Sequence, residues 1–469
     1  GMIWVPNGTY QLSDHIEINH HDILIRGESQ EGVKIQLLNN SKGDAGAFFF
    51  QGNFNYRHAN IIRKLKRGDR RVYVNDMGLF EGVEHIYLQR DKKPDFHKGH
   101  ASQNPRVYAL QMVKIVKKTN NYLEFDIPAR VSYPADGLSR VYLYDPVCRV
   151  GIENLSIYHP REIKGEHRSH GISFHFVSDF WVKGVSFYNI THHYIDYKLA
   201  SRGEIRDSYF QGTPRRAKGG GNGYVGFWYA SDCLMENVRA KNTRHIAFQV
   251  YASGNVIRKC HFEDAVDLNF HNLYPAHNLF ELNYLNDFTE LSKATGLSWG
   301  IFTSPSNSSE HSTLGPYNVV YNNQFETREF GGGLHLGGLE ENFMFLYNWV
   351  ELEGSGYYDR PYGDELEPAI AFGNESRNTL VRGNVFSLAK GGERDTWAVA
   401  RMSTHSQSIY DEYRIEENTF IGFREDRHFK DYPAVSRGNI FIPHSKNSPL
   451  PQAPVPSIYE WQMNRKKFP

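Results

Sequence analysis

The chain has 469 residues, of which 40% are hydrophobic and 14% aromatic, so it can bury a large core. Its 53 Lys and Arg residues balance its 53 Asp and Glu residues, and no global charge points to nucleic acid or an anionic membrane as a partner. No apolar run is long enough to span a membrane. Cys148, Cys233 and Cys260 lack metal-ligand spacing, so we expect three buried thiols.

Residues 1–53 predict the first coils of a stack of short strands. They open with the strand and turn of IWVPNGTYQL and continue through DILIRGES. No signal peptide is visible, yet the chain begins abruptly in a strand. We therefore expect that upstream residues, including a signal peptide, were removed. This expectation makes the protein secreted, periplasmic or attached to the cell surface.

Residues 54–147 interrupt the short strands with longer alternating ones, such as RRVYVND and YALQMVKIVKK. Alternation with a period of two and a polar outer face is typical of antiparallel sheets. We therefore predict an inserted antiparallel β subdomain in this range.

Residues 148–442 carry a short repeat, clearest in three copies of roughly 22 residues between Gly223 and Phe280. Each copy holds an apolar strand, a small polar break and a second strand. One copy cannot bury its own apolar face, so the copies must stack. A recurring Asn before an apolar residue predicts an internal ladder of amides. Its members are Asn237, Asn255, Asn278, Asn323, Asn348, Asn384, Asn418 and Asn439. The Pro-rich tail, residues 443–469, should run over the surface or cover the end of the stack.

The short coils, the recurring Asn, the PNGTY segment and the Asn-x-Phe turns resemble right-handed parallel β-helix proteins of the pectate-lyase-like superfamily. The resemblance covers residues 1–50 and about 148–440. It implies an all-β fold, a right-handed parallel β-helix carrying the antiparallel insertion, and a groove that binds long carbohydrate chains. The stretch VDLNFHNLYPAHNLF is also similar to β-helix enzymes that act on algal sulfated polysaccharides, such as fucan-degrading hydrolases. The motifs of classical pectate lyases and polygalacturonases are not found.

Aligning the first strands of successive coils predicts which side chains face the groove. The inward set is Ile172, Phe174, Val225, Phe227, Ile246, Phe248, Leu268 and Phe270. The outward set, which we expect to bind substrate, includes Asp196, Lys198, Trp228, Gln249, Asn269 and His335. Asp196 and Asp267 lie three coils apart, roughly 14 Å at the usual coil spacing. That separation is too long for an acid–nucleophile pair.

The third copy of the repeat places Asp267, Asn269 and His271 at outward positions. Asp is disfavoured in strands, so Asp267 needs a reason to be there. With Glu263 and Asp264 in the preceding turn, these residues predict a catalytic set of Asp267, His271, Glu263 and Asp264. Clustered carboxylates can keep one member protonated as an acid. The same oxygens could hold Ca²⁺, or cap the coil as a solvated turn; no other cofactor or metal site is predicted.

The insertion TPRRAKGGGNG concentrates positive charge at Arg215 and Arg216. Arginine binds carboxylates and sulfates through two hydrogen bonds, so this segment predicts a site for substrate anions. The alternative is a basic surface loop.

The leading hypothesis is a secreted endo-acting glycoside hydrolase that cleaves an anionic polysaccharide, either sulfated or uronic, with no nucleic-acid or membrane partner. One alternative is a polysaccharide lyase that acts by β-elimination. It would use His271 or Lys198 as the base, and Arg215 or Ca²⁺ to neutralise the uronate. The other is a carbohydrate-binding protein without chemistry, such as a tailspike or adhesin. The oligomeric state is left open.

Overall fold

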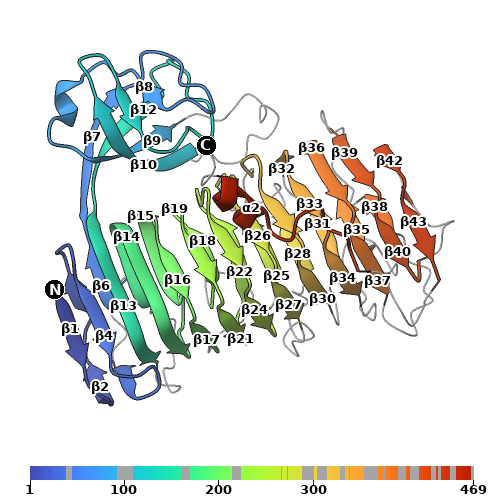
Figure 1. Cartoon of the computed structure of the whole chain (residues 1–469), viewed down its shortest axis with the longest axis horizontal. Helices are drawn as coiled ribbons and strands as arrows, with labels where there is room; N and C mark the ends of the chain where they lie inside the picture. The colour runs from blue at the N-terminus through green and yellow to red at the C-terminus, as the bar shows by residue number, and fades with distance from the viewer. Residues whose placement is uncertain are drawn as a thin grey trace.

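The computed structural model describes residues 1–38, 45–91, 109–159, 170–213, 223–265, 267–271, 273–287, 300–303, 314–327, 333–336, 339–352, 368–372, 375–388, 398–401, 411–423, 429–430, 435–443 and 450–465. In these ranges the chain winds into a right-handed parallel β-helix, as Figure 1 shows. The predicted all-β fold is thereby confirmed. No described helix is long and apolar enough to cross a membrane.

The first coils lie on both sides of the insertion in sequence. They comprise β1 (Met2–Val5), β2 (Gly8–Leu12), β3 (Ile16–Ile18), β4 (Leu24–Gly27), β5 (Val33–Leu37), β6 (Gly46–Gln51), β13 (Val147–Tyr158), β14 (His170–Tyr188), β15 (Ile195–Ser201), β16 (Glu204–Arg206) and β17 (Tyr209–Gln211). Strand β14 is long enough to bend around the coil. It pairs in turn with β15, β16 and β17, so one strand serves three faces.

The later coils form three parallel columns of short strands. The first column is β18 (Val225–Trp228), β22 (His245–Gln249), β25 (Asp267–His271), β28 (Gly300–Thr303), β31 (Leu334–Leu336), β35 (Ile370–Phe372), β38 (Val399–Arg401) and β41 (Phe429–Lys430). The second is β20 (Leu234–Glu236), β23 (Val256–Arg258), β26 (Leu279–Glu281), β29 (Val319–Tyr321), β33 (Met344–Leu346), β36 (Glu375–Arg382), β39 (Asp411–Glu416) and β42 (Val435–Arg437). The third is β21 (Arg239–Lys241), β24 (His261–Glu263), β27 (Tyr284–Asp287), β30 (Gln324–Thr327), β34 (Trp349–Leu352), β37 (Val385–Leu388), β40 (Thr419–Ile421) and β43 (Ile440–Ile442).

Apolar side chains from all three columns fill the coil. Every residue of the predicted inward set is at most 1% exposed and belongs to the apolar core of the β-helix, which confirms the facing assignment. Aromatic rings stack from coil to coil, for example Phe227 on Phe248 and Phe280 on Phe325. These ring contacts stabilise the fold in addition to the burial of apolar area, and each contact joins only neighbouring coils.

Two Asn ladders run along the inside of the turns. One joins Asn255, Asn278 and Asn318; the other joins Asn283, Asn323, Asn348, Asn384, Asn418 and Asn439. At each step the amide nitrogen donates to the next amide oxygen, as at 3.1 Å between Asn348 and Asn384. The prediction was wrong for Asn237, which is exposed and bonds to Asp207 at 2.7 Å. The backbone N–H groups of Cys233 and Cys260 occupy the corresponding turns and donate to the first amide of each ladder.

The insertion forms an antiparallel sheet of six strands, in the order β7 (Asn53–Asn60), β12 (Ser139–Asp145), β9 (His85–Arg90), β10 (Ala109–Lys118), β11 (Leu123–Phe125) and β8 (Arg71–Val72). It lies beside the coils that contain β13 and β14, as Figure 1 shows. Its apolar core also includes four residues of the β-helix, Phe176, Leu199, Tyr251 and Tyr274. The insertion and the β-helix therefore share one apolar cluster.

Polar contacts also join the insertion to the β-helix. Arg130 donates to Ser253 Oγ at 3.0 Å and pairs with Asp232. The carbonyl oxygen of Arg130 accepts a bond of 2.9 Å from His277 Nε2. Burial, assisted by the charge of Arg130, lowers the pKa of His277 to about 3.

We therefore expect acid to weaken this interface. An unfolded His binds a proton near pH 6.5, whereas folded His277 does so only near pH 3. The neutral form stabilises the fold above pH 6.5, and this contribution declines as the pH falls toward 3. At pH 5 the loss is about 2 kcal/mol. Urea unfolding at pH 7 and pH 5 measures it. His277→Gln should show a correspondingly smaller pH effect, and an equal effect in both proteins would contradict the assignment.

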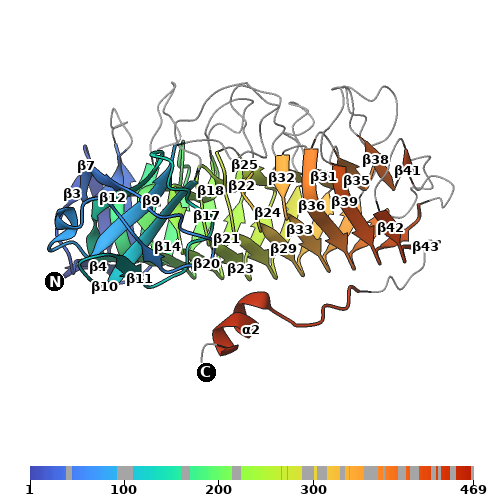
Figure 2. The same cartoon turned by 90° about the horizontal axis from the view of Figure 1, so that it is seen from above.

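Residues 450–465 of the C-terminal tail run along the side of the coils and include α2 (Ile458–Arg465), as Figure 2 shows. Glu281 accepts bonds from Ser457 Oγ at 2.6 Å and from the N–H of Ile458 at 2.8 Å. Arg258 bonds to Glu460 at 2.5 Å. Of the two predicted positions, the tail takes the surface rather than the end of the stack.

Candidate active site

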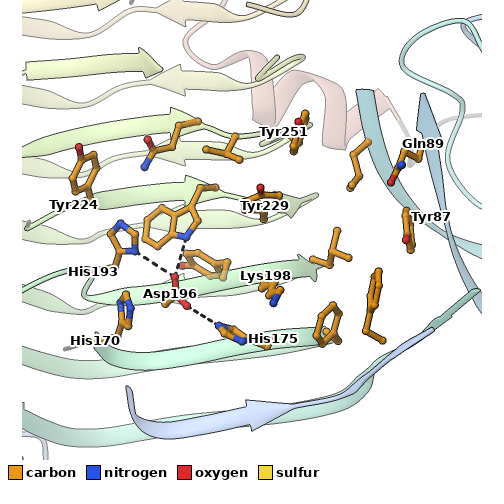
Figure 3. A pocket seen from close by; sticks show the side chains of 18 of the residues that line it. Tyr87, Gln89, His170, His175, His193, Asp196, Lys198, Tyr224, Tyr229 and Tyr251 are labelled. Carbon is orange, nitrogen blue, oxygen red and sulfur yellow. Dashed lines mark hydrogen bonds and ion pairs between the residues drawn. The ribbon is translucent and has the colours of Figure 1, made fainter. Parts of the chain in front are cut away.

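A pocket of about 840 Å³ lies between the insertion and the outer face of the β-helix. Strands β14, β15, β18 and β22 supply one side, and β7, β9 and β10 supply the other. Figure 3 shows the side chains converging from both parts. Aromatic rings line much of it, including Tyr56, Tyr87, Trp228, Tyr229 and Tyr251. This is the size and the mixture of apolar and polar groups that ligand sites usually have.

Asp196 is the centre of the polar side of this pocket. Its carboxylate lies 2.6 Å from His175 Nε2, 3.3 Å from His193 Nδ1 and 3.1 Å from Trp228 Nε1. Burial opposes ionisation of this group. The charge of His170 and the two histidine hydrogen bonds outweigh burial, and they hold the pKa of Asp196 well below its usual value.

An ionised carboxylate can only accept hydrogen bonds, so the three nitrogens around Asp196 all donate to it. His175 therefore carries its proton on Nε2 when neutral, and Nδ1 is its basic atom. The carboxylate also orients the ring, as the Asp of a catalytic triad orients its His. Asp196 thus places a polarised imidazole at the wall of the pocket.

Strand register explains this grouping. Asp196 and Lys198 are two residues apart on β15, so their side chains leave the same face. On the preceding coil, Ser173 lies opposite Asp196 and His175 lies opposite Lys198. Lys198 is exposed in the pocket, with Nζ 5.6 Å from the ring centre of Phe176. It has no ion-pair partner among the described residues, so its charge is available to a ligand.

The pocket also borders a strained corner of the coils. Phe176, Leu199, Tyr229 and Tyr251 line it with φ values of 56°, 50°, 45° and 60°. Bulky residues rarely adopt this left-handed conformation, which costs on the order of 1–3 kcal/mol each. Many other turns of the β-helix use Asp or Asn, which tolerate it better, although Arg202, Leu282 and Tyr347 also adopt it. Backbone strain of this kind is often found at functional sites. Here the strained residues pack their large side chains against the insertion.

Asp267 lies outside this pocket. It is 0% exposed, so the expectation that it faces solvent was wrong. His245, its partner on the adjacent strand, donates from Nδ1 to Asp267 at 2.6 Å. Arg244 Nε in turn donates to His245 Nε2 at 3.0 Å. The strand pairs confirm that Asp196 and Asp267 are three coils apart. A catalytic role for Asp267 stays a prediction.

The two other predicted carboxylates are not brought to the pocket. Glu263 ends β24, in a different column from Asp267, and pairs with Lys241 at 3.1 Å. That hydrogen bond lowers the pKa of Glu263, which suits a surface ion pair better than a proton donor. Asp264 is left-handed at φ 53°, and its N–H donates to Asn286 Oδ1 at 2.8 Å, as a structural turn residue would.

The remaining predicted residues divide into two groups. Trp228 and Gln249 line the pocket together with Asp196 and Lys198. Asn269 and His335 are buried on β25 and β31, and half-buried His271 lies beside Gln249 on the next coil. None of these three belongs to the pocket lining. Arg215 and Arg216 fall outside the described residues.

Sequence reasoning placed His175 on the outward face with Asp196 and Lys198, but it missed His170, His192 and His193. His175 alternates with inward residues on β14, His170 begins that strand, and His192 and His193 lie in the turn before β15. A paired His three residues before an Asp was the available signal. The aromatic residues that the insertion contributes to the pocket had no such signal. Alternation predicts that the insertion is a sheet, but it does not predict which part of the β-helix that sheet packs against.

Comparisons with known proteins support the fold. No protein-family model matches this sequence, and no curated protein matches it. Tailspike gp61 of Pseudomonas phage phi297 has a TM-score of 0.55 at 10% identity, covering 89% of this chain and 70% of that chain. Tailspike gp49 of Pseudomonas phage LKA1 has 0.54 at 11%, covering 89% and 72%. The A-module of Azotobacter vinelandii mannuronan C-5 epimerase AlgE6 has 0.51 at 13%, covering 95% and 91%. This chain shares the right-handed parallel β-helix fold of these proteins.

Proposed function

We propose that the protein is a carbohydrate-active enzyme that cleaves a uronic polysaccharide by β-elimination in the pocket around Asp196. A pocket of about 840 Å³ with rings on both sides suits sugar units, whose apolar faces stack on aromatic side chains. The structural neighbours include an epimerase named for mannuronan, which fits the same substrate class. The observation that carries the proposal is an oriented imidazole, His175, opposite a lysine that has no ion-pair partner among the described residues.

Each step of elimination has a residue in reach. Lys198 pairs with the uronate carboxylate and withdraws charge from the adjacent carbon. His175, oriented by Asp196, removes the proton from that carbon through Nδ1. The electron pair of the broken C–H bond forms a carbon–carbon double bond, and the bond to the glycosidic oxygen breaks. That oxygen leaves with a proton from solvent or from a tyrosine of the pocket such as Tyr229.

Hydrolysis, the reaction first expected from the sequence, uses two carboxylates on either side of the bond. Among the described residues that line the pocket, Asp196 is the one carboxylate. Its three donors already hold it in a positioning role. Hydrolysis by Asp267, Glu263 and Asp264 stays a prediction for a site elsewhere on the coils. Secretion, likewise, stays a prediction.

Product chemistry separates the reactions. Uronic and sulfated polysaccharides would be screened with two readouts, new reducing ends and the ultraviolet absorbance of a new double bond. We expect both signals to rise together on a uronic polymer. Reducing ends without absorbance would indicate hydrolysis. Binding without either signal would indicate a carbohydrate-binding protein. Each of these two results would overturn the proposal.

A lysine variant tests substrate recognition separately. Lys198→Ala removes the cation that pairs with the uronate, so KM should rise about 10- to 100-fold, the range for a charged hydrogen bond. Lys183→Ala is the matched control, because Lys183 is exposed on β14 outside the pocket; it should leave KM unchanged. Equal KM values for the two variants would remove Lys198 from the site.

A further inference from the structure

Three histidines gather at one end of the pocket. His170 begins β14, and His192 and His193 lie in the turn before β15. One ring nitrogen from each lies within 4.8 Å of the other two. His170 is 1% and His192 is 9% exposed, so the group is largely withdrawn from water. Figure 3 shows His170 and His193 on the same side of Asp196.

The spacing of two of these nitrogens matches that of ligands on one metal ion. His170 Nε2 and His192 Nδ1 are 3.4 Å apart. Two nitrogens bound to one tetrahedral zinc ion at about 2.0–2.1 Å lie about 3.3–3.4 Å apart. The ring centres of His170 and His193 are 5.1 Å apart, and those of His192 and His193 are 4.0 Å apart, so the third ring lies against the other two.

The backbone around the histidines is fixed. The carbonyl of His192 accepts from the N–H of Gly223 at 2.6 Å, and that of His193 accepts from the N–H of Gly171 at 3.1 Å. A Cβ at Gly171 would lie 2.5 Å from the carbonyl oxygen of Tyr194. Glycine therefore lets β14 approach the His192–His193 turn closely. Ligands held on such a scaffold lose little freedom when they bind an ion.

Asp196 completes the arrangement. His193 donates from Nδ1 to Asp196 Oδ1 at 3.3 Å, and coordination through Nε2 would keep this bond. Metal-bound histidines commonly donate their other nitrogen to a carboxylate, which fixes the ring and strengthens the ligand. The three histidines all line the pocket, so a fourth position on the ion would face it. Three protein ligands with one open position is the pattern of catalytic zinc sites.

We infer that His170, His192 and His193 bind one divalent transition-metal ion of the zinc class, with an open position toward the pocket. Imidazole nitrogens select such ions over Ca²⁺ and Mg²⁺, which take oxygen ligands. The open position would accept an anionic group of a ligand, such as a carboxylate. The metal site is independent of the reaction proposed above, because binding is measured without substrate.

The test uses the full chain, purified without a polyhistidine tag and treated with chelator. Calorimetric titration with ZnCl₂ should give one ion per chain, and His192→Gln should weaken binding at least about 10-fold, since one of three ligands is lost. His261→Gln is the matched control, because His261 is a half-exposed ring on another column of strands. Equal binding by both variants, or none by the wild type, would overturn the inference.

Cobalt gives a readout that does not depend on the variants. Co²⁺ added to the wild-type protein should develop the intense visible bands of a tetrahedral ion. Calcium chloride should give no heat in the same titration. A weak octahedral spectrum, or displacement of Co²⁺ by Ca²⁺, would contradict the three-histidine site even if His192→Gln failed to fold.

Discussion

Replacing Asp196 with Asn should lower kcat at least about a hundredfold on the best uronic substrate. The carboxylate accepts from His175, His193 and Trp228, and its charge fixes which nitrogen of His175 is basic. An amide keeps the size of the side chain but replaces one acceptor with a donor. His175 Nε2 would then face an amide N–H group, or the proton of His175 would move to Nδ1, which removes the basic atom from the pocket. Losses of about 10²–10⁴ follow when a positioned base or its orienting carboxylate is disabled.

The matched control is Asp207→Asn. Asp207 is exposed on another face, where it accepts one bond from Asn237. Its activity should equal that of the wild type. Circular dichroism on both variants separates a lost reaction from a lost fold. A folded Asp196→Asn protein with more than half the wild-type kcat would exclude Asp196 from the mechanism.

Replacing Asn348 with Ala should lower the free energy of unfolding by about 3–5 kcal/mol. Asn348 Oδ1 accepts from the N–H and the amide of Asn323, each at 2.9 Å. Its own amide donates to the carbonyl of Val320 at 3.0 Å and to Asn384 at 3.1 Å. Alanine leaves these buried groups without partners, and each unsatisfied group costs about 1–3 kcal/mol, partly offset by local rearrangement.

Asn237→Ala is the control for this ladder prediction. It removes one exposed hydrogen bond to Asp207, so its effect should stay below about 1 kcal/mol. Urea unfolding followed by tryptophan fluorescence measures both variants. Similar midpoints for the two proteins would show that the ladder contributes no more than a surface contact.

The fold was predictable because its signals are local and repeated. Alternation between inward residues such as Phe248 and outward residues such as Gln249 recurs on each coil, and stacking is the one way to bury that face. Recurring Asn residues mark the turns for the same reason. Asn237 failed because the turn it occupies faces solvent, where its amide bonds to Asp207 instead of a buried neighbour. A sequence pattern does not distinguish these two environments.

The site was predictable in part. Outward facing selected Asp196, Lys198, Trp228 and Gln249, and all four line the pocket. Asp267 was predicted to be catalytic because its outward position in the strand was taken to mean that its side chain is exposed. Its side chain is instead buried and bonded to His245, which alternation cannot reveal. The position of Tyr87 in the pocket depends on how the insertion packs against the β-helix. The local sequence gives no signal for contacts between residues so far apart in the chain.

Mass spectrometry of the products tests the central proposal most directly. A size-defined oligosaccharide of the best substrate would be cleaved to completion, and the masses of the two fragments would be summed. Elimination adds no water, so the sum should equal the mass of the intact oligosaccharide, and one fragment should carry the double bond. A sum greater by one water molecule would establish hydrolysis and contradict the assignment of His175 and Lys198 to the reaction.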